Sequence, residues 1–272
     1  MKDNPERAQS MKTNPAETKA MKTQIPYLLV SFGLFFFSEL TTYAVVTLST
    51  GHVDGFEVHY DPAVVSPEEP FGLHIHDDTT NTHYEPADVV LQVNQSAFGV
   101  YGDVFTSSTR LGWTGESGWV LPSIQSETVD EVGDPAMLFL GVASDGGGVM
   151  WAGNQFKISL ISVGANNPGD FAMYRFSGSG SFSNPINTKN GVSSSDVLTV
   201  SSIGGHEHWN WAFSEAGEYT LNFQASGLLG DTLFESAVET YTFNVIPEPT
   251  CGTLLLTAFS VGMSLRRRFF RS

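Results

Sequence analysis

The stretch "HEHWNWAFSEAGEYTLNFQA", residues 206–225, alternates large apolar side chains with polar ones. Trp209, Trp211 and Phe213 stand at every second position, and alternate residues of a β-strand share one face of a sheet. We therefore predict that these three rings are buried in a core. The same alternation predicts that the two histidines of the stretch, His206 and His208, lie on the opposite, polar face.

The second half of this stretch, "EAGEYTLNF" (215–223), is typical of a strand that enters an immunoglobulin-like sandwich. Gly217 lies where the chain must turn, and glycine adopts backbone angles that other residues avoid. Tyr219 follows two residues later, where its hydroxyl can cap the corner. These features predict an all-β, immunoglobulin-like fold.

Similar alternating runs recur between short clusters of turn residues. The runs include "FEVHY" (56–60), "FGLHIH" (71–76), "DVVLQV" (88–93), "FKISLISV" (156–163), "FAMYRF" (171–176) and "ETYTFNV" (239–245). The turns include "DDTTN" (77–81), "SDGGG" (144–148) and "ANNPGD" (165–170). Period-2 runs between such turns indicate antiparallel strands, and no long segment has helical periodicity. We predict one domain over residues 45–246, a single antiparallel β-sandwich.

This predicted domain is strongly acidic. Residues 45–246 hold four Lys/Arg against 24 Asp/Glu, a net charge of −20, and all seven histidines. Such a surface excludes nucleic acid as a partner, because phosphate binding needs basic residues. It favours cations, although acidity also serves simply to keep a surface protein in solution. The single cysteine, Cys251, lies outside the domain, which therefore contains no disulfide and no thiolate metal ligand.

Residues 1–44 have the features of an extension followed by a secretory signal peptide. Lys22 gives a positive start, and residues 27–37 form an apolar run too short to span a bilayer. Thr42 and Ala44 supply small residues at both required positions of a cleavage site. We predict export by the Sec machinery and cleavage after Ala44.

The start of translation has two alternatives. Met1, Met11 and Met21 are each followed by lysine, and "MKDNP" is nearly repeated as "MKTNP". Translation from Met21 would make the first twenty residues an over-extended reading of the gene. Translation from Met1 would give the signal peptide a long polar n-region.

Residues 247–272 have the order of a membrane sorting signal, with a Pro-Glu-Pro triplet, an apolar segment and an arginine cluster. Its defining residues are Pro247, Glu248, Pro249, Arg266, Arg267 and Arg268. Arginines after an apolar segment stay in the cytoplasm, so the domain must lie outside. The apolar segment has about 15 residues, short of the roughly 20 of a stable span. This suits a transient stop in the membrane.

The same arrangement closely resembles the PEP-CTERM sorting signal of Gram-negative bacteria. The resemblance implies that an exosortase in the inner membrane recognises the triplet and cuts near it. The protein would contact the membrane only through this C-terminal segment before processing. It would then reach the cell surface or the extracellular matrix.

Two His-x-His pairs, His74/His76 and His206/His208, lie on predicted strands. A strand brings residues i and i+2 to one side about 6 to 7 Å apart, so both imidazoles can reach one ion. Zn²⁺ takes three or four N, O or S ligands, and Cu²⁺ and Ni²⁺ also accept imidazole. We predict a transition-metal site at His206 and His208, shared with His74 and His76 or with His52. The alternative is a row of solvated histidines on a sheet face.

Four segments of the domain together resemble the choice-of-anchor M domain, a surface-anchored β domain of bacteria. The matching positions are Gly51, His52, Asp54, Trp119, Leu121, Pro122, His206, His208, Trp211, Phe213, Gly217 and Tyr219. One departure is Trp209, a second tryptophan between the last histidine and Asn210. Members occur beside metal-type ABC transporters, and some PEP-CTERM members are similar to proteins repressed by a zinc-uptake regulator. The resemblance implies zinc capture at the cell surface, with a metal-uptake transporter as a partner.

The sequence contains no motif of a common enzyme class. Gly-x-Ser-x-Gly, His-Glu-x-x-His, P-loop and dinucleotide-binding patterns are all absent. We predict a non-enzymatic protein that binds zinc or a similar metal through surface histidines. One alternative is a structural surface or matrix protein without specific metal binding. Another is a zinc-dependent hydrolase with Glu207 or Asp54 as the base.

Overall fold

The computed structural model describes residues 45–64, 70–130, 132–133, 135–201 and 203–247. All of them belong to one unit of the chain, Tyr43–Ser272. The predicted signal peptide (1–44) and the sorting segment from Glu248 onward lie outside the described residues. Within these residues, no helix has the length and apolar character needed to cross a membrane.

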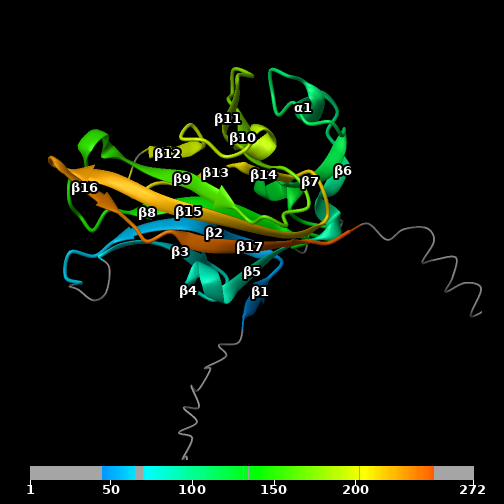
Figure 1. The fold of residues 1–272 in the computed structure, drawn as a ribbon. Coiled ribbons are helices and arrows are strands. Elements are labelled where there is room, and N and C mark those ends of the chain that lie inside the picture. The colour runs from blue at the N-terminus through cyan, green and yellow to red at the C-terminus, as the bar shows by residue number, and fades with distance from the viewer. Residues whose placement is uncertain (1–44, 65–69, 131, 134, 202, 248–272) are drawn as a thin grey trace, which may run out of the picture. The chain divides into compact units, whose positions relative to one another are not determined.

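In the described part of the chain, the strands form three sheets (Figure 1). The histidine sheet contains, in order, β13 (His206–His208), β8 (Leu138–Asp145), β2 (Gly51–Tyr60), β3 (Phe71–Asp77) and β4 (Thr82–Tyr84). The tryptophan sheet contains β11 (Phe182–Asn187), β10 (Phe171–Phe176), β14 (Asn210–Phe213), β7 (Ser117–Leu121) and β6 (Phe98–Val100). The large sheet contains β1 (Val46–Leu48), β5 (Val89–Val93), β17 (Glu239–Val245), β15 (Gly217–Leu229), β9 (Gln155–Val163) and β12 (Val197–Ser201), with β16 (Thr232–Glu235) paired to β15.

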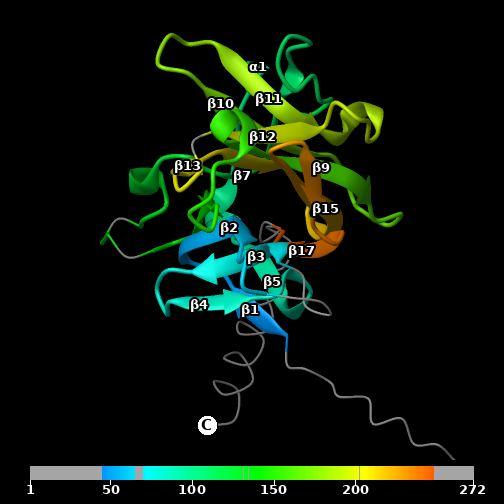
Figure 2. The same cartoon turned by 90° about the vertical axis from the view of Figure 1, so that its left-hand side faces the viewer.

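Among the described residues, helical structure is limited to short pieces. They are α1 (Asp103–Thr106) and the 3₁₀ turns Pro86–Asp88, Gln95–Ala97, Gln125–Glu127, Ala152–Asn154 and Thr188–Asn190. The prediction of a β-rich fold is therefore confirmed. Figure 2 shows β2, β3 and β4 side by side in the histidine sheet.

The strand directions differ from the predicted, purely antiparallel sandwich. β2 pairs with β8 in parallel, and β5 pairs in parallel with both β1 and β17. Parallel neighbours need a long crossover connection, whereas a hairpin can join only antiparallel strands. The chain makes such crossovers, because more than one strand separates each of these pairs in the sequence. The antiparallel form of the prediction is wrong for these pairs.

The alternating runs place their apolar residues in the core as predicted. Trp209, Trp211 and Phe213 are 3%, 0% and 0% exposed. The predicted inward residues of β2 and β3 are also buried: Phe56, Val58, Tyr60, Phe71, Leu73 and Ile75. Burial of these rings and branched chains supplies the main driving force for folding.

All three sheets contribute to one core. The ring of Phe56 on β2 lies 4.8 Å from the ring of Trp211 on β14, between centroids. The same ring lies 4.7 Å from Phe223 on β15 and 5.1 Å from Tyr241 on β17, in edge-to-face contacts. Aromatic pairs favour this geometry. The histidine sheet is thus fixed to the other two sheets through its apolar face, which leaves its outer face for polar residues.

The chain changes sheets at Trp209. Before it, β13 pairs with β8 in the histidine sheet, and after it β14 pairs with β10 and β7 in the tryptophan sheet.

Beyond β14, Gly217 has a φ of +129°, in the region that favours glycine. The hydroxyl of Tyr219 donates to the backbone carbonyl of Glu215 at 2.9 Å and accepts from the backbone amide of Glu215 at 3.1 Å. The predicted tyrosine cap on this corner is confirmed.

Candidate metal centre

The histidine sheet gathers polar side chains above one glycine. Asp54 on β2 and His208 on β13 both lie opposite Gly141 of β8, the strand between them. His52 and His206 stand two positions away on the same two flanking strands. Alternate residues share a face, so all four side chains lie on the face of Gly141.

Gly141 leaves the space in which these side chains meet. A Cβ atom at this position would overlap Asp54 Oδ1 and His206 Nε2. No other residue could stand here without moving one of them. The glycine therefore forms the floor of the cluster.

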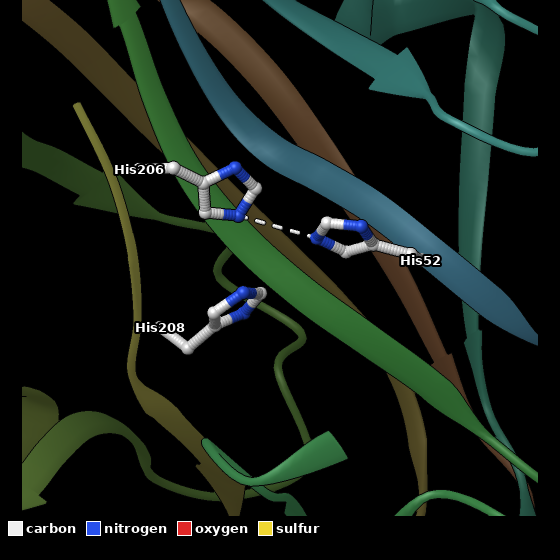
Figure 3. Close-up of side chains that lie close together, drawn as sticks. All are labelled: His52, His206 and His208. Atoms are coloured by element: carbon white, nitrogen blue, oxygen red, sulfur yellow. Dashed lines mark hydrogen bonds between the residues drawn. The ribbon is translucent and has the colours of Figure 1, made fainter. Parts of the chain in front are cut away.

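The three imidazoles point toward one another (Figure 3). His52 Nε2 lies 3.2 Å from His206 Nε2, and the ligand atoms of His52, His206 and His208 all lie within 4.8 Å of one another. Asp54 Oδ1 lies 3.3 Å from His206 Nε2 and 4.0 Å from His52 Nε2. At a Zn–N distance of about 2.0–2.1 Å, tetrahedral ligand atoms are about 3.3 Å apart. The separations around His206 have this size.

Hydrogen bonds at Nδ1 leave Nε2 of His52 and His208 as the ligand atom, and His52 Nε2 is itself within hydrogen-bonding distance of His206 Nε2, at 3.2 Å. His208 Nδ1 donates to the carbonyl of Leu140 at 2.9 Å. His52 Nδ1 lies 2.5 Å from Asp78 Oδ2, and the amide of Asp78 donates to the carbonyl of His52. A proton held at Nδ1 leaves the lone pair on Nε2, which is the usual arrangement of metal-binding histidines.

The carboxyl group of Asp54 lies in a poorly solvated place. Its side chain is only 6% exposed, and Oδ1 is buried without a hydrogen-bond partner. Burial raises the pKa of Asp54, an effect opposed by the nearby imidazole of His206. An unpaired buried carboxylate is costly, and a bound cation would offset that cost.

The ring of His208 is held firmly. It stacks on Phe139 with ring centroids 3.7 Å apart and an angle of 15° between the planes. Burial lowers the pKa of His208 to about 4, although its hydrogen bond to Leu140 acts in the opposite direction. At neutral pH this imidazole is therefore uncharged, which is the form that binds metals.

The predicted histidines fall into different parts of the sheet. His52 joins His206 and His208, one of the two combinations predicted from the sequence. His76 lies close to this cluster, 3.7 Å from Asp54 Oδ2. His74 lies apart, 3.7 Å from Glu85, and burial lowers its pKa. The structure does not bring the complete His74/His76 pair to His206 and His208.

Two carboxylates of the site were not predicted as ligands. Asp54 has a signal in the sequence, since His52-x-Asp54 repeats the i, i+2 spacing of the histidine pairs. Asp78 belongs to the turn "DDTTN", whose position relative to His52 depends on the pairing of β2 with β3. Glu207, the other residue proposed as a base, instead accepts from Arg175 Nη1 at 2.7 Å.

No family model, curated protein or solved structure matches this chain. The chemistry of the site is therefore inferred from its residues and their geometry. Among the described residues, one of the groups that could hold a metal ion is His52, His206 and His208, and Asp54 Oδ1 lies 3.3 Å from His206 Nε2 beside it.

Proposed function

We propose that this protein binds Zn²⁺ at His52, His206, His208 and Asp54, and that it captures the metal at the cell surface without catalysing a reaction. One observation carries the proposal. Three imidazoles and an unpartnered buried carboxylate oxygen gather above Gly141, and the distances from His206 Nε2 to His52 Nε2 and to Asp54 Oδ1, 3.2 and 3.3 Å, suit a tetrahedral ion. Three nitrogens and one oxygen are a ligand set that zinc accepts readily.

The destination of the protein follows from the two ends of the chain and is part of the proposal. The signal-like segment and the PEP-CTERM-like tail support Sec export, a tethered intermediate in the inner membrane, and processing by an exosortase. The resemblance to the choice-of-anchor M domain supports zinc over copper or nickel and a metal-uptake transporter as a partner. The Tyr219 corner supports an immunoglobulin-like arrangement of the strands around it.

Calorimetric titration of the purified, metal-free protein tests the binding of zinc. We expect Zn²⁺ to bind at micromolar concentration or below, while Mg²⁺ and Ca²⁺ do not compete, because imidazole is a poor ligand for these hard cations. Chelation of the zinc should lower the melting temperature, since a ligand that binds only the folded state stabilises it. Zinc binding no tighter than about millimolar would instead favour the alternative function, a structural surface protein whose histidines are solvated.

Zinc affinity is expected to fall as the solution is acidified. Metal binding needs neutral imidazole, and free histidine protonates near pH 6.5. Burial keeps His208 neutral down to a pH of about 4, so protonation of this residue does not limit binding. At pH 5.5 we expect affinity at least about tenfold below that at pH 7.5, measured by the same titration. Constant affinity over this range would indicate a site made of carboxylates.

Gly141→Ala is expected to weaken zinc binding by about 10–100-fold, the usual cost when a ligand loses its orientation. The added methyl group would displace Asp54 Oδ1 or His206 Nε2 although every ligand is still present. Gly72→Ala, on β3 of the same sheet, is the matched control, because its methyl group would only touch the His74 ring at 3.6 Å. Unchanged affinity in a folded Gly141→Ala variant would place the metal elsewhere.

A hydrolase is the competing function, and the geometry argues against it. Asp54 is placed to fill the fourth position, whereas catalytic zinc sites keep one position open for water. Glu207 is paired with Arg175 and is not available as a base beside the metal. Assays of ester and peptide hydrolysis with zinc present are expected to give no activity above that of the free metal. Zinc-dependent turnover above that of the free metal would instead support the hydrolase.

A further inference from the structure

All seven histidines of the sequence lie on strands of the histidine sheet, on β2, β3, β4 and β13. A second cluster on this sheet adjoins the proposed zinc site and consists of His76, Asp54 and Asp78. It is placed by register, since His76 on β3 lies directly opposite Asp54 on β2. The following turn brings Asp78 to the same place.

Each of the two carboxylates in this cluster directs its two oxygens toward two different histidines. Asp54 directs Oδ1 toward His206, at 3.3 Å, and Oδ2 toward His76 Nδ1, at 3.7 Å. Asp78 directs Oδ2 toward His52 and Oδ1 toward His76 Nδ1, at 3.1 Å. Each carboxylate therefore has one oxygen on the zinc side and one oxygen on the His76 side.

The second nitrogen of His76 indicates which atom carries the proton. His76 Nε2 lies 3.3 Å from Asn81 Oδ1, an acceptor, so Nε2 is the donor in the neutral ring. The lone pair on Nδ1 then faces two carboxylate oxygens. Three electron-rich atoms meet at a point where the His76 side chain is 16% exposed and that of Asp54 is 6% exposed. Such a group is costly to bury unless a metal cation, or a proton on Nδ1, lies between its members.

We infer that a second divalent cation binds between His76 Nδ1, Asp54 Oδ2 and Asp78 Oδ1, with Asp54 bridging it to the proposed zinc ion. This inference rests on the proposed function and extends it to a two-ion centre. One nitrogen and two oxygens form a harder ligand set than the first site offers, so Mn²⁺ as well as Zn²⁺ suits it. The second ion is held more weakly and is loaded after the first.

A neighbouring group, Glu57, His76 and His83, is a poorer candidate for this ion. The rings of His76 and His83 are stacked, 4.3 Å apart and 10° from parallel, so their lone pairs do not converge on one point. His83 Nδ1 is bound to Glu57 Oε2 at 2.7 Å.

Equilibrium dialysis against Zn²⁺ followed by elemental analysis of the full-length protein measures the number of ions. We expect two per chain in the wild type, one in His76→Ala and one in His76→Gln. The matched control His74→Ala, two positions away on the same strand, should keep two. Thermal unfolding of the metal-free variants shows whether each one is folded.

The outcomes separate the two proposals. No bound ion in the wild type would overturn the proposed zinc site and the second site together. One ion in the wild type, kept in His76→Ala, would overturn only the second site and leave a protonated His76 between the carboxylates. Loss of all metal in a folded His76→Ala variant would also overturn it, since His76 would then belong to a single shared site.

Discussion

Zinc binding is expected to weaken to about millimolar or beyond when both histidines of β13 are removed, in His206→Ala/His208→Ala. The variant leaves only His52 and Asp54 beside Gly141, whereas a tight zinc site needs three or four protein ligands. The loss should exceed that of Gly141→Ala, which displaces a ligand but deletes none. Calorimetric titration beside the wild type measures it.

A second double variant controls for the simple loss of histidine. His59 and His74 lie on the same sheet with ring centroids 5.8 Å apart, and they belong to none of the groups among the described residues that could hold a metal ion. His59→Ala/His74→Ala should therefore keep the affinity of the wild type for the first ion. Equal affinities in the two double variants would mean that the histidines act only as a diffuse, exchangeable surface.

Trp211→Ala is expected to lower the free energy of unfolding by about 3–5 kcal/mol. The ring is 0% exposed and packs on Phe56, Phe171 and Phe243, with centroids 4.8, 6.1 and 5.7 Å away. Its Nε1 has no hydrogen-bond partner, so the loss comes from packing and from the cavity left behind. Urea unfolding followed by circular dichroism measures the difference.

Leu233→Ala on β16 is the comparison for this substitution. Leu233 is 56% exposed, so its truncation should change the free energy of unfolding by no more than about 0.5 kcal/mol. An effect of Trp211→Ala as small as that of Leu233→Ala would contradict the assignment of this ring to the core.

Period-2 alternation predicted much of the core and half of the site. It predicted that Trp209, Trp211 and Phe213 are buried and that His206 and His208 point outward. These positions depend only on the local geometry of a strand. It also predicted β structure throughout the domain. The neighbours of each strand are non-local, and the parallel pairing of β2 with β8 was therefore not predicted.

A bulge in β2 explains why the other half of the site was harder to predict. The pairing of β2 shifts between Asp54 and Glu57, so the outward positions change from even to odd numbers along the strand. A bulge inserts one residue and has this effect on all side chains beyond it. Strict alternation, followed back along the strand from Glu57, would predict that the His52 side chain points inward. A Cβ at Gly55 would lie 3.4 Å from the Trp211 ring, at the near limit of ordinary van der Waals contact.

The position of β8 between β2 and β13 has a consequence for when the metal is acquired. His52 and His206 are 154 positions apart in the sequence, and only the pairing of their two strands with β8 brings them together. The unfolded chain therefore offers at most isolated His-x-His and His-x-Asp pairs, which hold metals weakly. Selectivity among divalent metals depends strongly on which metal is available at the time of binding. A chain that crosses a membrane unfolded would thus take its ion from the compartment where folding finishes, and the cytoplasmic metal pool would have no part in the choice.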